Sequence, residues 1–174
     1  MSKTLINTFA QQLIAWHRVG GRSGLPWQGN RDPYAVWVSE IMLQQTQVAT
    51  VLERYPRFMK RFPTVKKLAA ADIDEVLAEW AGLGYYSRAR NLHACAKQVI
   101  AEFGGKFPSD PALLEQLKGI GRSTAGAIAA FAFHERAPIL DANVKRILAR
   151  LFAVEGSIQD KTVNDQLWSL ATDL

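Results

Sequence analysis

The sequence has one cysteine, few histidines and no long apolar run, and each scarcity excludes a class of protein. Cys95 is the single cysteine among 174 residues, which excludes an internal disulfide framework and fits a reducing compartment. The three histidines lie far apart without ligand spacing, so they predict no metal site. No apolar run is long enough to cross a bilayer, and polar side chains recur through residues 1–16 where a signal peptide would lie. We therefore expect a cytoplasmic protein that binds no membrane.

The charge balance favours a polyanionic partner. Lysine and arginine total 21 residues against 16 aspartates and glutamates, which gives a net charge of +5 and an isoelectric point near 9.5. Many basic proteins bind no nucleic acid, so the charge alone leaves the partner open.

Almost every segment has the apolar spacing of an α-helix, and we predict an all-α protein. Asp72 with Glu75 predicts a capping box, and Asp110 before Pro111 predicts a helix start. Cys95 falls on an apolar helix face and is predicted to be an inert core thiol. No stop signal follows the last helix, so we expect the chain to be cut short. The predicted helices cover the apolar stripe from Leu5 to Trp16 and residues 34–45, 48–62 with a boundary at Pro56, 87–103, 122–133, 143–152 and 161–171.

The segment from Leu117 to Ala125 contains the most informative turn. Gly119 and Gly121 bracket one apolar residue, and such a tight turn can point backbone N–H groups outward. The helix that starts there adds the positive end of its dipole, so a phosphate can bind without a basic side chain. With Asp141 close behind, the pattern suggests an enzyme that grips a nucleic-acid backbone and acts on the adjacent sugar. The alternative is that Gly-Ile-Gly only joins two helices.

Taken together, the motifs resemble those of the helix-hairpin-helix DNA glycosylases, and among these the A/G-specific adenine DNA glycosylases. The segments Leu-Gln-Gln-Thr-Gln and Gly-Leu-Gly-Tyr-Tyr separate this group from its relatives. The matching segments are Leu25–Trp27, Pro33–Tyr34, Trp37–Val48, Gly82–Leu92, the hairpin and Leu140–Arg146.

The resemblance implies an all-α fold of two helical lobes with a DNA cleft between them. A six-helix barrel domain would cover residues 25–135 and include the helix-hairpin-helix at about 110–133. Residues 1–24 and 136–174 would form the second lobe, an incomplete iron–sulfur cluster domain. The implied partner is double-stranded DNA containing A:8-oxoguanine or A:G mismatches, bound by a monomer associated with the nucleoid.

Glu40 is the predicted general acid. Its helical neighbours Val36, Trp37 and Leu43 are apolar, which disfavours the charged carboxylate and predicts a raised pKa. Taken alone, Glu40 is equally typical of a hydrogen-bonded structural residue. The resemblance implies that it protonates adenine N7 and then activates the water that completes hydrolysis.

Asp141 is predicted to stay ionised, because it precedes a helix and helix-end N–H groups stabilise its charge. An aspartate in this place is often only a structural cap. The resemblance assigns it to the sugar, where it would stabilise an oxocarbenium-like transition state, with Asn143 orienting it by a hydrogen bond. One protonated and one ionised carboxyl group is the pattern that glycoside hydrolysis uses.

Ser123 distinguishes between relatives. In the endonuclease III-like members that also cut the strand, this position is a lysine that forms a Schiff base. Serine cannot form that imine, so the resemblance implies a monofunctional glycosylase. Lys145 lies one turn after Asp141 and is expected to contact a phosphate or solvent, with weak lyase activity as the alternative.

The target base must leave the stack before either carboxyl group can reach its glycosidic bond. The resemblance implies that Gln45 and Tyr85 intercalate around 8-oxoguanine, with Leu43 and Thr46 beside them. Tyr85 has the alternative of a buried aromatic residue. The resemblance also implies that Leu25 and Trp27 line the adenine pocket, and Trp27 has the alternative of a core residue.

The basic residues near the two turns are expected to contact phosphates, although each alone is typical of a solvated surface charge. They are Arg88, Arg90, Lys118 and Arg122.

The sequence departs from the resembled family in two ways. Full-length members carry four cysteines for a [4Fe–4S] cluster, whereas this chain has only Cys95, so we expect no cofactor here. Ala142 replaces the usual glycine between Asp141 and Asn143. These departures leave open a catalytically impaired DNA-binding fragment. A third alternative, an endonuclease III-like glycosylase/lyase for oxidised pyrimidines, is disfavoured by Ser123 and by the segment Leu43–Thr46.

Overall fold

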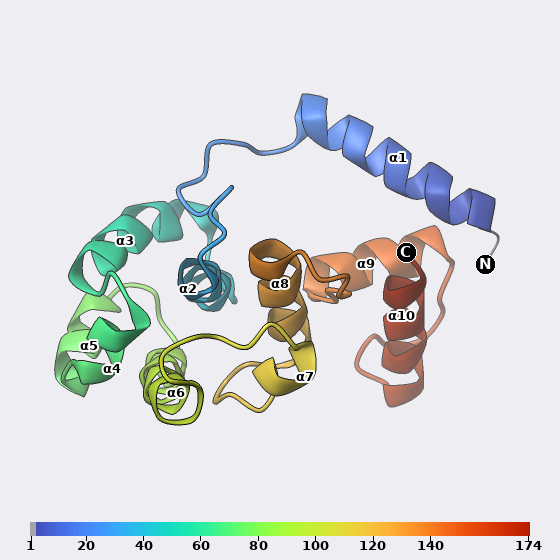
Figure 1. The fold of residues 1–174 in the computed structure, drawn as a ribbon. Coiled ribbons are helices and arrows are strands. Elements are labelled where there is room, and N and C mark those ends of the chain that lie inside the picture. Colours follow the sequence, from blue (N-terminus) through green and yellow to red (C-terminus); the bar gives the residue numbers. More distant parts are fainter. Residues whose placement is uncertain (1–2) are drawn as a thin grey trace. The chain divides into compact units, whose positions relative to one another are not determined.

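The computed structural model describes residues 3–174, and in this range the chain consists of α-helices joined by loops, without a strand (Figure 1). The all-α class is confirmed. The chain separates into two compact units. The larger unit is Leu25–Ala137, and the smaller unit comprises the chain up to Gly24 together with Pro138–Leu174. The helices of the larger unit are α2 (Pro33–Leu43), α3 (Val48–Arg61), α4 (Val65–Ala70), α5 (Ile73–Glu79), α6 (Ser87–Phe103), α7 (Pro111–Leu114) and α8 (Arg122–Phe133).

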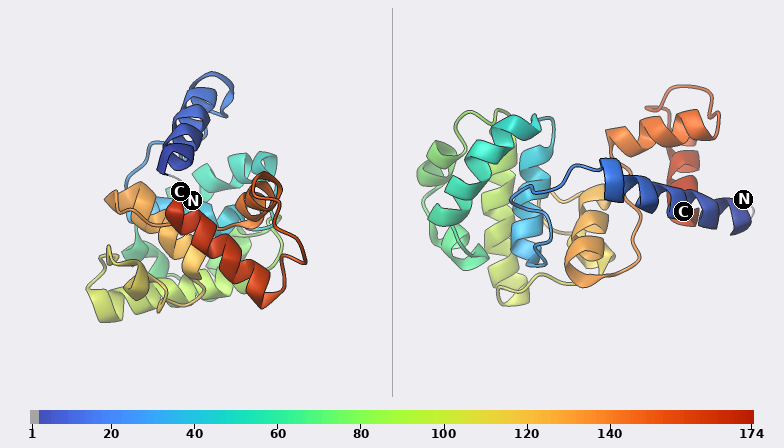
Figure 2. Two further views of the ribbon diagram at one scale, coloured as in Figure 1. Left: turned by 90° about the vertical axis from the view of Figure 1, so that its right-hand side faces the viewer. Right: turned by 90° about the horizontal axis from the view of Figure 1, so that it is seen from above.

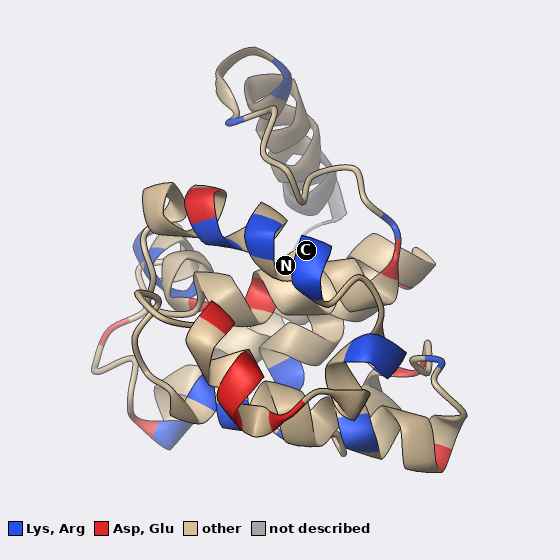
Figure 3. Cartoon of the chain, turned by 90° about the vertical axis from the view of Figure 1, so that its left-hand side faces the viewer, with Lys and Arg blue, Asp and Glu red and all other residues tan. Residues whose placement is uncertain are grey.

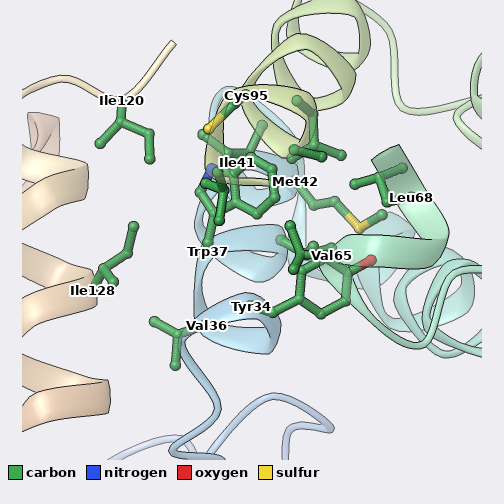
Figure 4. Close-up of a cluster of buried hydrophobic side chains, with 14 of the residues drawn as sticks. Tyr34, Val36, Trp37, Ile41, Met42, Val65, Leu68, Cys95, Ile120 and Ile128 are labelled. Carbon is green, nitrogen blue, oxygen red and sulfur yellow. The ribbon is translucent and has the colours of Figure 1, made fainter. Parts of the chain in front are cut away.

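Helix α2 is the centre of the larger unit. It begins at Pro33 after Asp32, whose carboxylate accepts a hydrogen bond from the Tyr34 N–H at 3.1 Å. Apart from Ser39 and Glu40 its residues are mainly apolar, and it packs against α3, α6 and α8. Figure 4 shows Ile120 and Ile128 on one side of α2, with Val65 and Leu68 on the other. A helix that is mainly apolar is stable only when it is buried in this way.

Two helix boundaries differ from the sequence-based prediction. Helix α3 runs through Pro56 without a break, so the predicted boundary there is wrong. Val51, Tyr55 and Phe58 are buried on both sides of the proline, and this packing holds the helix despite the missing N–H. Helix α4, which no sequence signal predicted, starts where the Thr64 hydroxyl accepts a hydrogen bond from the Lys67 N–H.

The capping signals are partly confirmed. Asp72 caps α5 by accepting a hydrogen bond from the Asp74 N–H at 2.8 Å, as an N-cap should. The reciprocal half of the predicted capping box is replaced, because Glu75 forms an ion pair with Arg61 of α3. Helix α6 ends at Gly104, whose left-handed φ of 61° suits glycine.

Cys95 lies fully buried on α6, among the apolar side chains of the core (Figure 4). Burial away from any charged partner raises the pKa of its thiol to about 12. The prediction of an inert core thiol is therefore confirmed.

The smaller unit contains α1 (Lys3–Gly20), α9 (Ala142–Leu151) and α10 (Lys161–Asp173). Helices α9 and α10 cross and pack against each other, as both views of Figure 2 show. Leu140, Leu148 and Leu167 form the buried centre of this pair. In the described part of the chain, no helix is long and apolar enough to span a membrane.

Candidate nucleic-acid interface and carboxylate sites

The loop after α2 places Gln45 in a strained, outward position. Helix α2 ends at Leu43 and Gln44 is extended. Gln45 then has a φ of 54°, a value that residues other than glycine rarely adopt. The Gln45 side chain is exposed, while Leu43 is half-buried against the core and Thr46 is half-buried beside it. This backbone conformation projects Gln45 away from the body of the larger unit.

The turn before α6 likewise places Tyr85 on left-handed backbone with an exposed side chain. Gly82 and Gly84 have φ values of 89° and 71°, and Tyr85 follows with a φ of 47°. Tyr85 is 61% exposed, so the alternative that it is a buried aromatic residue is wrong. A large exposed ring on a constrained turn is suited to stacking on a base.

Arg88 connects these two segments. Its Nη1 donates to the carbonyl oxygens of Ile41, Met42 and Gln44 at 2.7, 3.1 and 2.5 Å. Its Nη2 donates to the Thr46 hydroxyl at 2.9 Å and to the carbonyls of Leu83 and Gly84 at 2.9 and 3.2 Å. The guanidinium is therefore occupied by acceptors of the protein itself, which the sequence analysis missed when it placed Arg88 among the phosphate contacts. The sequence around Arg88 gave no sign of this role, because most of its hydrogen-bond acceptors lie more than forty residues away.

The hairpin between α7 and α8 is held from α6. Gln98 accepts a hydrogen bond from the Lys118 N–H at 2.9 Å and donates one to the Gln116 carbonyl at 3.3 Å. Gly119 has a φ of 76°, and a Cβ there would lie 2.8 Å from the Asn91 Cβ. Only glycine fits this approach of the hairpin to α6.

Gly121 differs from Gly119. Its φ of −94° is open to any residue, and a Cβ would meet nothing within 4 Å. It is the N-cap residue of α8 and, lacking a side chain, makes no side-chain cap bond. Arg122 is exposed and Ser123 half-buried in the same turn. Gly121 is the N-cap of α8, a position that favours glycine, so the alternative that the glycines only join two helices stays open.

The end of α2 and the start of α8 are tied together. The Gln44 amide donates to the Thr124 hydroxyl at 3.3 Å. The loop of Gln45, the turn of Tyr85 and the hairpin therefore belong to one hydrogen-bonded region of the larger unit.

Glu40 lies on α2, one turn before this region. It is half-buried, and Val36 and Trp37 on the preceding turn are buried, as the spacing of the sequence predicted. Leu25 and Trp27 precede α2 and are both half-buried. Trp27 packs edge-on against the core residue Tyr55, with ring centroids 5.6 Å apart, so its alternative as a core residue is supported.

Asp141 caps α9 in the smaller unit, as predicted. Its Oδ1 accepts hydrogen bonds from the N–H groups of Asn143 at 2.9 Å and Val144 at 2.8 Å. Asp141 is exposed, and both cap bonds go to Oδ1, so Oδ2 takes part in neither. The Asn143 side chain accepts from Arg146 at 2.8 Å, so its contribution to holding Asp141 comes from the main chain. Lys145 is half-buried one turn later.

The basic charge is not gathered on the helices around α4 and α5. In the view of Figure 3, lysine and arginine alternate with aspartate and glutamate over this part of the larger unit. Lys118, Arg122 and Arg90 are exposed near the hairpin and the turn of Tyr85. Any attraction to a polyanion is therefore set by local charges rather than by one basic face on that side.

The residues present do not fit a four-thiolate iron–sulfur cluster. Cys95 is the single cysteine of the sequence and is enclosed by apolar side chains. Within residues 3–174, no three histidine, cysteine, aspartate or glutamate side chains gather where they could hold a metal ion.

Comparisons with known proteins agree with this arrangement. The family described as HhH-GPD superfamily base excision DNA repair protein matches residues 38–172. The adenine DNA glycosylase of Buchnera aphidicola subsp. Acyrthosiphon pisum is 44% identical over 162 residues, which cover 93% of this chain and 46% of that protein. The adenine DNA glycosylase of Homo sapiens is 44% identical over 178 residues, which cover 97% of this chain and 32% of that protein. The chain thus spans less than half the length of these two relatives.

Solved structures show the same fold. A thermostable thymine-DNA glycosylase superposes with a TM-score of 0.85 at 28% identity, covering 95% of this chain and 76% of that one. A non-covalent endonuclease III–DNA complex superposes with a TM-score of 0.80 at 22% identity, covering 100% of this chain and 78% of that one.

Proposed function

Since this chain belongs to the HhH-GPD superfamily of base excision DNA repair proteins, we propose that it hydrolyses the N-glycosidic bond of adenine mispaired with 8-oxoguanine or guanine. The observation that carries the proposal is its 44% identity to an adenine DNA glycosylase across 93% of its own length. The substrate is double-stranded DNA that contains the mismatch.

The hairpin would hold the DNA backbone. The start of α8 carries the positive end of a helix dipole, and Gly121 leaves room for a phosphate to approach it. Gly119 sets the shape of the turn, while exposed Arg122 and Lys118 add positive charge beside it. Lys145 in the smaller unit would add a further phosphate contact.

Two exposed side chains would enter the base stack when adenine is extruded. Gln45 and Tyr85 both stand on left-handed backbone, so their side chains project from the surface of the larger unit. Tyr85 would stack on the unpaired 8-oxoguanine, and Gln45 would fill the stack beside it, with Leu43 and Thr46 supporting them. Leu25 and Trp27 would line the pocket that receives adenine.

Two carboxyl groups would then break the glycosidic bond. Glu40, half-buried against apolar side chains, would donate a proton to adenine N7 so that the base leaves as a neutral molecule. Ionised Asp141, held by two N–H groups of α9, would stabilise the positive charge that develops on the sugar. A water molecule deprotonated by Glu40 would complete hydrolysis at C1′. Because Ser123 offers no amine for an imine, the enzyme would release the base without cutting the strand.

Base release from defined duplexes tests the proposal. The chain is incubated with duplexes that contain A opposite 8-oxoguanine, A opposite G, or an oxidised pyrimidine, and free base and strand breaks are measured. Glu40→Gln and Asp141→Asn should each slow adenine release by at least about 100-fold, because each removes an acid–base or charge-stabilising group. Glu53→Gln, an exposed carboxylate on α3, is the matched control and should keep wild-type rates.

The other outcomes select between the alternatives. Release of oxidised pyrimidines with strand cleavage would indicate a glycosylase/lyase. Tight binding of the A:8-oxoguanine duplex without any base release would indicate a DNA-binding fragment. Adenine release that survives both carboxyl substitutions would refute the assigned residues.

A further inference from the structure

We propose that Arg88 is a positioning residue that holds Gln45 and Tyr85 in their left-handed conformations, so that both side chains enter the DNA as one pre-formed unit. This inference rests on the function proposed above and adds a residue that never needs to touch the DNA. It is drawn from the contacts of one guanidinium group with the two segments that carry the exposed side chains.

The loop after α2 and the turn before α6 each contain one residue other than glycine in the left-handed conformation. In the larger unit, Gln45 and Tyr85 combine a positive φ with an exposed side chain. A residue other than glycine leaves this conformation unless its neighbours are fixed. Hydrogen bonds to the residues on either side would supply such a restraint.

The bonds of Arg88 fall on those flanking residues. Nη1 binds the carbonyl of Gln44 and Nη2 the hydroxyl of Thr46, so Gln45 is held from both sides. Nη2 also binds the carbonyl of Gly84, directly before Tyr85, at 3.2 Å. The guanidinium carbon lies 5.6 Å from the centroid of the Tyr85 ring, which adds a cation–π contact.

The same group completes the end of α2. The carbonyls of Ile41 and Met42 belong to the last turn, where no backbone N–H of the helix can reach them, and Nη1 donates to both. Each NH₂ group has two hydrogens for three acceptors, so some of these bonds are shared. The guanidinium carbon also lies 5.4 Å from the centroid of the Trp80 ring, a second cation–π contact. The α2 carbonyls and the Trp80 ring therefore hold the Arg88 side chain in place.

The geometry requires the fork of an arginine and not merely a positive charge. Two nitrogens on one rigid plane reach the α2 loop and the Tyr85 turn at once, whereas the ammonium of a lysine is a single point with three donors. Arg90, two residues further along α6, is exposed and provides a matched control with the same charge.

The test compares Arg88→Lys, Arg88→Met and Arg90→Met in the full chain. Single-turnover adenine release gives the maximal rate and the half-saturating duplex concentration. A second duplex carries 2-aminopurine next to 8-oxoguanine, and its fluorescence rises when the stack is opened, whether or not a base is released. Melting curves show that each variant is folded.

Both Arg88 variants should raise the half-saturating duplex concentration at least tenfold and lose most of the 2-aminopurine signal, with the maximal rate changed much less. Arg88→Lys should resemble Arg88→Met, and Arg90→Met should weaken binding only as far as the loss of one exposed charge does. In a Gln45→Ala/Tyr85→Ala background, Arg88→Met should add less than a twofold effect, because it acts through those side chains. If Arg88→Met does not fold, Thr46→Val removes one acceptor of Nη2 and should produce a smaller shift in the same direction.

A wild-type binding curve for Arg88→Lys would overturn the inference, because charge alone would then suffice. An Arg88→Met effect that is undiminished in the Gln45→Ala/Tyr85→Ala background would also overturn it. If the wild type opens the stack without releasing adenine, the proposed activity fails and the positioning role stands. If the wild type releases adenine and the Arg88 variants keep its half-saturating concentration, only the positioning role fails. A wild type that neither opens the stack nor releases adenine refutes both.

Discussion

The two glycines of the hairpin should respond differently to the same substitution: Gly119→Ala should lose stability, whereas Gly121→Ala should keep it. In Gly119→Ala, the methyl group must adopt a φ of 76° and lies 2.8 Å from the Asn91 Cβ. The left-handed conformation costs an alanine about 1–2 kcal/mol. Overpacking against a neighbour costs about 1–3 kcal/mol more. The expected loss in the free energy of unfolding is therefore about 2–5 kcal/mol from these two effects.

Gly121→Ala is the matched control for stability. Its backbone φ of −94° accepts alanine, and a Cβ would meet nothing within 4 Å. Replacing a glycine at a compatible φ restricts the unfolded chain and contributes about 0.4–1 kcal/mol of stability. Gly121 is also the N-cap of α8, where alanine is less favoured than glycine, so the two effects offset each other and little net change in stability is expected. The added methyl group would instead obstruct the phosphate proposed to approach α8, so DNA affinity should fall while stability holds.

Thermal unfolding and duplex binding separate these effects. A loss of 2 kcal/mol corresponds to a melting temperature lower by roughly 4–8 °C in a protein of this size. The double variant Gly119→Ala/Asn91→Gly removes the close contact and should recover the packing part of the loss, leaving the backbone part. The reasoning is refuted if Gly119→Ala melts like the wild type, or if Gly121→Ala destabilises the protein while its DNA affinity is unchanged.

Three further predictions follow from single side chains. Burial raises the pKa of the Cys95 thiol to about 12. The neutral thiol therefore contributes its full stability below the unfolded pKa of about 8.5, and this contribution is lost as the pH rises. The urea midpoint of the wild type should fall between about pH 8.5 and 10, whereas that of Cys95→Ala should stay level. Tyr34→Phe removes the buried hydroxyl that donates to the Phe62 carbonyl at 2.6 Å, and should lower the free energy of unfolding by about 1–3 kcal/mol in chemical denaturation; an unchanged midpoint contradicts this. Borohydride should trap no cross-link between the wild type and abasic DNA, whereas Ser123→Lys should form one; an efficient wild-type cross-link would count against hydrolysis without strand cleavage.

The sequence predicted helix ends correctly where the residues that set them are neighbours in the chain. Helix α6 ends at Gly104 and α8 starts after Gly121, as predicted, because a left-handed glycine and a glycine-rich turn act over neighbouring residues only. Asp141 was identifiable as a helix cap for the same reason, since its partners are the next N–H groups along the chain. The break predicted at Pro56 failed because burial of the surrounding side chains, which lies outside local propensity, decided it.

The residues themselves determined the all-helical class, the helix caps and the motifs that point to DNA repair, because periodicity, capping and short motifs are properties of adjacent positions. Only the tertiary structure decided which of two similar residues does which task. Arg88 and Arg90 stand two positions apart, yet one binds carbonyls more than forty residues away while the other is exposed. Gly119 and Gly121 also differ in what surrounds them, because Asn91 of α6 lies close to Gly119 and nothing lies within 4 Å of a Cβ at Gly121. Such roles depend on what packs against a residue, and the packing partner comes from a distant part of the chain.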